Sequence, residues 1–144
     1  MTRVGGLSVV NAHLLANTDG DWSAGNRFHP IHRAQLAALA QLVRGLGDPC
    51  VVTGDFNIPR HKPVVQDFLA ATGLTDAFGG ECPPTFQLAY LPAGMRSQCI
   101  DFILTTGLET DSTEVLFPEA LPRLGFVSDH LGLQARLVRS LPGG

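Results

Sequence analysis

The sequence lacks the features that would place it in a membrane, a disulfide-rich or a strongly basic class of protein. No apolar run approaches the roughly 18 residues that a membrane-spanning helix needs. Residues 1–10 lack the charged and then apolar layout of a signal peptide, so a cytoplasmic location is the default expectation. The ten Lys and Arg residues are scattered and the net charge is −3, so no broad basic surface for nucleic acid is predicted.

Cysteine is also scarce, and its spacing excludes a structural zinc site. The three cysteines are Cys50, Cys82 and Cys99, an odd number without the paired spacing of zinc ligands. Reduced thiols in a reducing compartment are the simpler interpretation. A bridge between Cys82 and Cys99 is the alternative that the sequence leaves open.

The composition that remains is that of a globular chain. Of 144 residues, 44% are hydrophobic and 16% charged, and no low-complexity tract or internal repeat occurs. A chain of this length buries roughly 70% of its unfolded surface. We therefore expect a single domain spanning residues 1–144.

The order of apolar patterns predicts a mixture of strands and helices. Residues 7–15 are apolar on both alternating faces, as in a covered strand, and the Gly- and Asp-containing stretch 17–28 predicts a loop. A helix is expected from Pro30 to Gly45, because leucine and valine recur at helical spacing between them. A strand at 50–53 and a second helix that ends at Gly73 follow. The remaining expected strands, which bring the total to about five, are 100–104, 113–117 and 131–138.

Four polar signatures lie at the ends of these predicted strands. They are Asn-Ala-His at 11–13, Gly-Asp-Phe-Asn at 54–57, Ile-Asp-Phe at 100–102 and Ser-Asp-His at 128–130. Sites in sheet proteins gather where strands meet loops, because the sheet fixes geometry there and the loops admit ligand. The placement therefore indicates one site built from four strands.

Each signature alone has a simpler structural interpretation. A single histidine in a strand, such as His13, is most often a satisfied core or edge residue, and Asp101 alone resembles an ordinary strand-end acid. Gly-Asp-Phe-Asn is commonly an Asx turn in which Asp55 and Asn57 bond to their own backbone. Together, however, Asp55, Asn57 and Asp129 offer the hard oxygen ligands of Mg²⁺ or Mn²⁺, and a histidine beside a carboxylate is a tuned acid or base.

These residues resemble the endonuclease/exonuclease/phosphatase superfamily, which includes deoxyribonuclease I, apurinic endonucleases and neutral sphingomyelinases. Over residues 7–137 the four signatures and a fifth, His-Arg-Ala-Gln-Leu at 32–36, occur in the order and at the intervals of that family. The resemblance implies an α+β fold, the deoxyribonuclease I-like four-layer sandwich. It also implies hydrolysis of a phosphate ester in nucleic acid, a phospholipid headgroup or a sugar phosphate.

The resemblance further implies a role for each site residue. Asp55 would activate or orient the attacking water, Asn57 would hold the phosphate or the metal, and Asp129 would bind Mg²⁺ or Mn²⁺. The remaining two roles concern histidine. His130, oriented by Asp101, would stabilise the phosphate or act as acid and base, and His13 would bind a phosphate oxygen.

The sequence also departs from the family pattern. Family domains are about twice as long, and their amino-terminal half supplies an Asn and a metal-binding Glu, neither of which has a counterpart before Asp55. We therefore expect a partial domain that begins in mid-fold. Because Mg²⁺ uses few protein ligands, the loss of one carboxylate predicts little or no activity for these 144 residues alone.

Two other functions compete with this interpretation. A catalytically inactive binding or scaffold relative would keep the fold without turnover, as the missing Glu suggests. A calcineurin-like metallophosphatase would need Asp-x-His early and Gly-Asn-His late, whereas this chain has Asn-Ala-His and Ser-Asp-His at those places.

Overall fold

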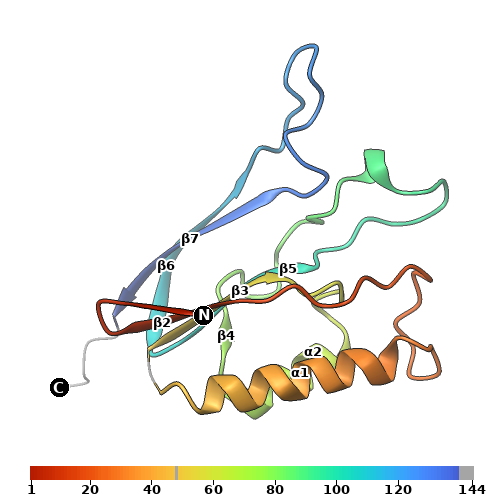
Figure 1. The fold of residues 1–144 in the computed structure, drawn as a ribbon. Helices are drawn as coiled ribbons and strands as arrows, with labels where there is room; N and C mark the ends of the chain where they lie inside the picture. The colour runs from red at the N-terminus through yellow and green to blue at the C-terminus, as the bar shows by residue number, and fades with distance from the viewer. Residues whose placement is uncertain (48, 140–144) are drawn as a thin grey trace.

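The computed structural model describes residues 1–47 and 49–139, which form a helix-backed sheet and a separate two-stranded ribbon (Figure 1). Residues 48 and 140–144 of the expected domain lie outside this described part. Neither described helix is long and apolar enough to cross a membrane.

The main sheet has five strands in the order β1-β2-β3-β5-β4. Only β2 and β3 run parallel, and the other neighbours are antiparallel, so the sheet is mixed. The strands are β1 (Thr2–Val4), β2 (Leu7–Asn11), β3 (Cys50–Asp55), β4 (Thr75–Asp76) and β5 (Asp101–Thr106). Strands β2, β3 and β5 therefore have a neighbour on each side, and the short strands β1 and β4 lie at the edges.

Two helices lie together below the sheet in the view of Figure 1. Helix α1 (His29–Arg44) has Pro30 in its first turn, where a missing N–H costs nothing. Helix α2 (Pro63–Thr72) also starts with proline and ends at Gly73, whose φ of 70° is the left-handed conformation that glycine adopts readily. Their apolar faces pack against the strands and form the hydrophobic core.

The core lies between the helices and the main sheet. The side chains of Val52, Phe56, Phe102 and Leu104 are almost completely buried there. Phe56 and Phe102 pack with ring centroids 4.6 Å apart, within the range preferred by aromatic pairs. Because Phe56 lies between Asp55 and Asn57, the core anchors the turn that carries these two polar residues.

The second sheet is an open ribbon of two antiparallel strands, β6 (Leu108–Leu116) and β7 (Gly132–Arg139). Its pairing register shifts between Thr110 and Ser112, which marks a β-bulge. Figure 1 shows the ribbon rising away from the helices. No described residue from 107 to 139 is fully buried, so this region contributes little to the core.

The predicted elements are confirmed in kind and approximately in position, but two strands were missed. The expected strand 7–15 ends at Asn11, which places His13 in the segment after it, and the expected strand 113–117 begins earlier, at Leu108. With strands β1 and β4, the described residues form seven strands instead of about five. They are short, and β1 is fully exposed at an edge, so neither leaves an apolar pattern to recognise.

Candidate active site

Asp55 and Asp101 lie directly opposite each other on neighbouring strands. Strand β3 ends at Asp55 and the antiparallel strand β5 begins at Asp101, and the two residues are register partners. Partners across a strand pair project from the same face of a sheet. The fold therefore fixes two carboxylates side by side, although the sequence separates them by 46 positions.

His130 joins these carboxylates from the other end of the described chain. Its Nδ1 lies 2.8 Å from Asp101 Oδ2, a hydrogen-bond distance, and its Nε2 lies 3.7 Å from Asp55 Oδ2. Ligand atoms of Asp55, Asp101 and His130 all lie within 4.8 Å of one another. It is the only such group of three acidic, histidine or cysteine side chains found among the described residues.

A short stretch of chain after Pro84 holds His130 in place. Phe86 pairs with His130 in an isolated β-bridge, and their rings meet edge to face with centroids 4.9 Å apart. The Leu131 amide donates to the Thr85 carbonyl, and the Gln87 amide donates to the Asp129 carbonyl, both at 2.8 Å. We call residues 85–87 the clasp, because they attach the segment 128–131 to the main sheet.

Thr85 also connects the clasp to Asp101. Its side chain is fully buried, and its hydroxyl oxygen accepts hydrogen bonds from the amides of Ile100 and Asp101, at 3.1 and 3.3 Å. One threonine thus fixes the start of β5 and, through its own carbonyl, the residue after His130. The same residue therefore helps to position both Asp101 and His130.

Asn57 completes a tight polar turn after β3. Its backbone amide donates to Asp55 Oδ1 at 2.7 Å, and its side-chain amide nitrogen donates to the Leu14 carbonyl and to Asp55 Oδ2. The Asn57 φ of 53° is left-handed, which Asn tolerates better than most residues. The Asx-turn interpretation of this motif is therefore correct as geometry, and the turn presents both side chains at the cluster.

Gly54 is required at the end of β3 by a close contact. A Cβ at this position would lie 1.8 Å from the carbonyl oxygen of Ala12. The chain after β2 runs alongside β3, with the amides of Ala12 and Leu14 donating to the carbonyls of Thr53 and Asp55 at 2.9 Å. His13 between them is 75% exposed in its side chain, with Nε2 lying 3.6 Å from Asp55 Oδ2.

The close packing of these side chains shifts the pKa values of Asp55 and His130. Burial is the main cause that raises the pKa of Asp55, and the neighbouring Asp101 charge adds to it against the lowering effect of the Asn57 amide. The hydrogen bond to Asp101 raises the pKa of His130. The pair formed by His130 and Asp101 therefore favours a protonated imidazole.

Asp129 lies beside the cluster but is not one of its three close members. Its side chain is exposed and its Oδ1 accepts a hydrogen bond from the Ser128 hydroxyl at 3.2 Å. Its charge is near enough to raise the pKa of His130. Of the sequence-predicted residues, the structure thus brings His13, Asp55, Asn57, Asp101 and His130 together and places Asp129 on the exposed rim.

The donor set fits a hard divalent cation. Two carboxylates face each other at partly buried positions; burial raises the pKa of Asp55, and repulsion from Asp101 adds to this effect. A cation would relieve that repulsion, and Mg²⁺ or Mn²⁺ prefers such oxygen donors, with Mn²⁺ also accepting imidazole. Asn57 Oδ1 is a further candidate donor, because its hydrogen bonds to Leu14 and Asp55 use the amide nitrogen.

Sequence reasoning missed the buried residues that support the cluster. Arg60 is buried, pairs with Asp76, and donates to the Asp101 carbonyl at 2.8 Å and to the Cys99 sulfur at 3.3 Å. Its local sequence gives no sign of burial, since arginine is mostly a surface residue. The three cysteines are free thiols, so the bridge between Cys82 and Cys99 is not formed in this structure.

The fold and the sequence have counterparts among known proteins. A crystal structure of humanized D. rerio TDP2 has a TM-score of 0.69 at 15% identity and covers 92% of this chain and 55% of that chain. The human Nocturnin catalytic domain has a TM-score of 0.66 at 22% identity, covering 92% and 47%. A functionally unknown conserved protein from Enterococcus faecalis V583 has a TM-score of 0.60 at 26% identity, covering 92% and 50%.

These likenesses confirm the expected deoxyribonuclease I-like α+β fold, and the chain spans about half the length of the structures that it matches. A search of curated proteins found no match. The sequence model of the Endonuclease/Exonuclease/phosphatase family matches residues 3–130, most of the chain. The chain therefore belongs to the endonuclease/exonuclease/phosphatase family.

Proposed function

We propose that the chain carries the catalytic cluster of a metal-dependent phosphodiester or phosphomonoester hydrolase, and that these 144 residues alone have little or no turnover. The observation that carries the proposal is the convergence of Asp55, Asp101 and His130 within 4.8 Å. Membership of a phosphoesterase family supports the reaction class. The low turnover follows from the absence of the family's metal-binding Glu before Asp55.

Asp55 is the group that accepts a proton from the attacking water or orients it. It is partly buried and fixed by two hydrogen bonds from Asn57, so its lone pairs have defined directions. Burial raises the pKa of Asp55, because it destabilises the charged form of the carboxylate. A nearby positive charge would stabilise that charged form. A bound Mg²⁺ or Mn²⁺, held by the carboxylates and Asp129, would supply that charge and neutralise the phosphate.

His130 is the group that donates to the phosphate. Its Nδ1–H points to Asp101, which leaves Nε2 directed toward the space beside Asp55. Because Asp101 raises the pKa of the imidazole, Nε2 carries a proton more readily and can donate to a developing negative oxygen. His13, exposed beside Asp55, is placed to contact a second phosphate oxygen.

The names of the similar structures agree with a phosphate-ester substrate. One structure of D. rerio TDP2 is complexed with a single-strand DNA product, and the Nocturnin domain carries a bound sulfate anion. Both are less than 25% identical to this chain. They support the class of ligand, and nucleic acid, phospholipid headgroup and sugar phosphate all remain candidate substrates.

The test measures hydrolysis of bis(p-nitrophenyl) phosphate and binding of Mn²⁺ by the 144-residue chain. We expect weak, Mn²⁺-dependent turnover at most, with both binding and any turnover reduced in Asp55→Asn and turnover abolished in His130→Ala. Arg33→Ala, an exposed substitution on α1, serves as the control. Mn²⁺ binding or turnover that survives Asp55→Asn unchanged would contradict the proposal.

The second candidate is an inactive binding or scaffold relative of the same fold. It predicts that no cation binds at the cluster. Calorimetric titration with Mn²⁺ separates the two, because a scaffold has no requirement for a metal.

A further inference from the structure

We infer that Cys82 and Cys99 form a peroxide-sensitive thiol pair, which oxidation converts into a disulfide that closes the loop carrying the clasp. The structure shows the reduced form, because both cysteines are free thiols. The pair lies outside the cluster of Asp55, Asp101 and His130. The inference therefore goes beyond the proposed hydrolase and does not depend on it.

The two thiols are neighbours in space, although they lie 17 positions apart in the sequence. A side-chain hydrogen bond joins the Cys82 thiol to the Cys99 sulfur. The backbone beside the pair is joined as well, since the Thr85 amide donates to the Gln98 carbonyl at 3.0 Å. A sulfur–sulfur bond of about 2.0 Å therefore needs only a small approach of two side chains that already interact.

A buried arginine fixes the position of Cys99. The Arg60 Nε–H donates to the Cys99 sulfur at 3.3 Å, and the Arg60 amide donates to the Cys99 carbonyl at 3.1 Å. The guanidinium is itself held by Asp76 and by the ring of Phe102, whose centroid lies 4.5 Å from the guanidinium carbon. Because Arg60 is held on these sides, Cys99 has little freedom to turn away from Cys82.

A surface cavity gives a small oxidant access to the pair. Cys82 and Cys99 both belong to the lining of a cavity of about 490 Å³. Cys82 is half-buried, and Cys99 keeps 9% of its surface exposed. Hydrogen peroxide is little larger than water, so this cavity admits it easily. Cys50, in contrast, is completely buried in the core.

The oxidation balances with hydrogen peroxide as a two-electron oxidant. Peroxide transfers one oxygen atom to the half-buried Cys82 sulfur, which forms a sulfenic acid and releases water. The Cys99 sulfur then attacks the Cys82 sulfur, and the sulfenic hydroxyl leaves with the Cys99 proton as a second water. Two thiols and one peroxide thus give one disulfide and two waters. A dithiol reductant reverses the change by thiol–disulfide exchange.

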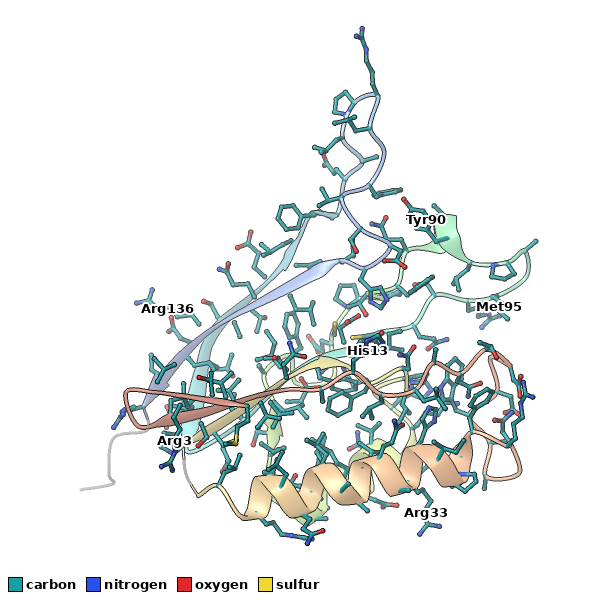
Figure 2. All side chains as sticks on the ribbon, in the orientation of Figure 1. Arg3, His13, Arg33, Tyr90, Met95 and Arg136 are labelled. Carbon is teal, nitrogen blue, oxygen red and sulfur yellow. The ribbon has the colours of Figure 1, made fainter. Side chains whose placement is uncertain are left out.

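The disulfide closes the part of the chain that holds His130. Residues 83–98 lie between the two cysteines and include the clasp at 85–87. Figure 1 shows this stretch as a long loop that extends away from the helices, and Figure 2 shows Tyr90 and Met95 on it. A cross-link at the base of the loop removes open conformations of the chain, so the clasp opens less often.

The sequence offers a direct assay for the bond, because trypsin cleaves after Arg96, between the two cysteines. We would treat the folded 144-residue chain with a small excess of hydrogen peroxide, block the remaining thiols, and compare tryptic fragments with and without reductant. Without reductant, the fragment that contains Cys82 should stay linked to the fragment that contains Cys99. The mass of the monomer before blocking should fall by two hydrogen atoms, and Cys50 should remain a thiol.

Three single variants identify the partners of the bond. Cys82→Ser and Cys99→Ser should each prevent the link, whereas Cys50→Ala is the matched control and should leave the link intact. Cys82→Ser changes a half-buried side chain, so it keeps the test decisive if the more deeply buried Cys99→Ser variant fails to fold.

The closure of the loop has its own measurable effects. Oxidation should raise the melting temperature by roughly 5–10 °C. It should also slow hydrogen exchange of the Gln87 and Leu131 amides, which make the hydrogen bonds of the clasp, by roughly tenfold or more. Both changes should be absent in Cys82→Ser and should reverse with dithiothreitol.

The inference is overturned if the two fragments separate without reductant, or if peroxide converts Cys82 to a sulfinic acid and no link forms. A link between two chains, or a link that includes Cys50, also contradicts it. A disulfide that forms but leaves the melting temperature and the exchange at the clasp unchanged would overturn the closure of the loop.

Discussion

The helix-backed sheet and the β6–β7 ribbon differ in how they are held, and the site draws on both. All fifteen residues of the core cluster lie between Val10 and Leu104, whereas no described residue from 107 to 139 is fully buried. Burial of apolar surface is the main stabilising term in folding. The sheet with its helices therefore carries most of the stability of this chain, and the ribbon carries little.

The candidate site takes its residues from both regions, the helix-backed sheet and the segment before the ribbon strand β7. His13, Asp55, Asn57 and Asp101 belong to the well-packed part, whereas His130 and Asp129 precede strand β7 of the ribbon. The clasp at 85–87, the Asp101 hydrogen bond and the approach of Nε2 to Asp55 attach His130 to the sheet. The carboxylates are therefore fixed by the core, whereas the histidine depends on a few local contacts.

The largest expected effect distinguishes the two regions by stability. Leu104→Ala empties a fully buried position in β5 and should lower the free energy of unfolding by about 2–5 kcal/mol. Leu124→Ala, at a position 81% exposed, should change it by less than about 0.5 kcal/mol. Urea unfolding measures both variants. Leu124 lies in the loop that joins β6 to β7, so equal losses would show that this hairpin carries as much of the stability as the sheet.

An intermediate effect is expected at the clasp. Thr85→Val keeps the shape of the side chain but removes the oxygen that accepts from the Ile100 and Asp101 amides. Leaving buried amides without a partner should cost about 1–3 kcal/mol and shift the Asp101 and His130 resonances. Thr110→Val on the exposed face of β6 is the matched control. An unchanged His130 spectrum in Thr85→Val would mean that the clasp does not position the histidine.

The smallest effect concerns the proton on His130. The hydrogen bond to Asp101 raises its pKa above the usual 6.5, so protonation favours the folded state. This stabilisation is complete below pH 6.5 and is lost as the pH rises through the folded pKa. In Asp101→Asn we expect the His130 midpoint in an NMR titration to fall, and the pH dependence of stability in that window to flatten. A midpoint that stays where it was would contradict the role of Asp101.

Much of the sheet and the polar turn could be predicted from local sequence. Burial of α1 and α2 is predicted by their apolar periodicity, and burial of β3 by its β-branched residues. The turn from Gly54 to Asn57 is predicted by residue types that favour turns. These features depend on neighbouring residues, which a single sequence contains. The fold class and the positions of most elements follow from them.

The partners within the site could not be derived from spacing alone. The pairing of Asp55 with Asp101 depends on which strands are neighbours, and the contacts of 85–87 with 128–131 join segments about 43 residues apart. Local sequence patterns do not predict contacts between distant segments. The orientation of His130 by Asp101 was therefore expected from the family resemblance alone. The metal-ligand role of Asp129 stays a prediction, since its carboxylate lies exposed beside the cluster.

The most direct measurement of the central claim is the broadening of histidine ring resonances by small additions of Mn²⁺. A cation held by Asp55 and Asp101 beside His130 should broaden the His130 and His13 signals first, because the effect falls steeply with distance, while His29 on α1 stays sharp. Asp55→Asn should reduce this selectivity. Broadening that is absent, or equal for all histidines and unchanged in Asp55→Asn, would contradict a metal-dependent site at this cluster.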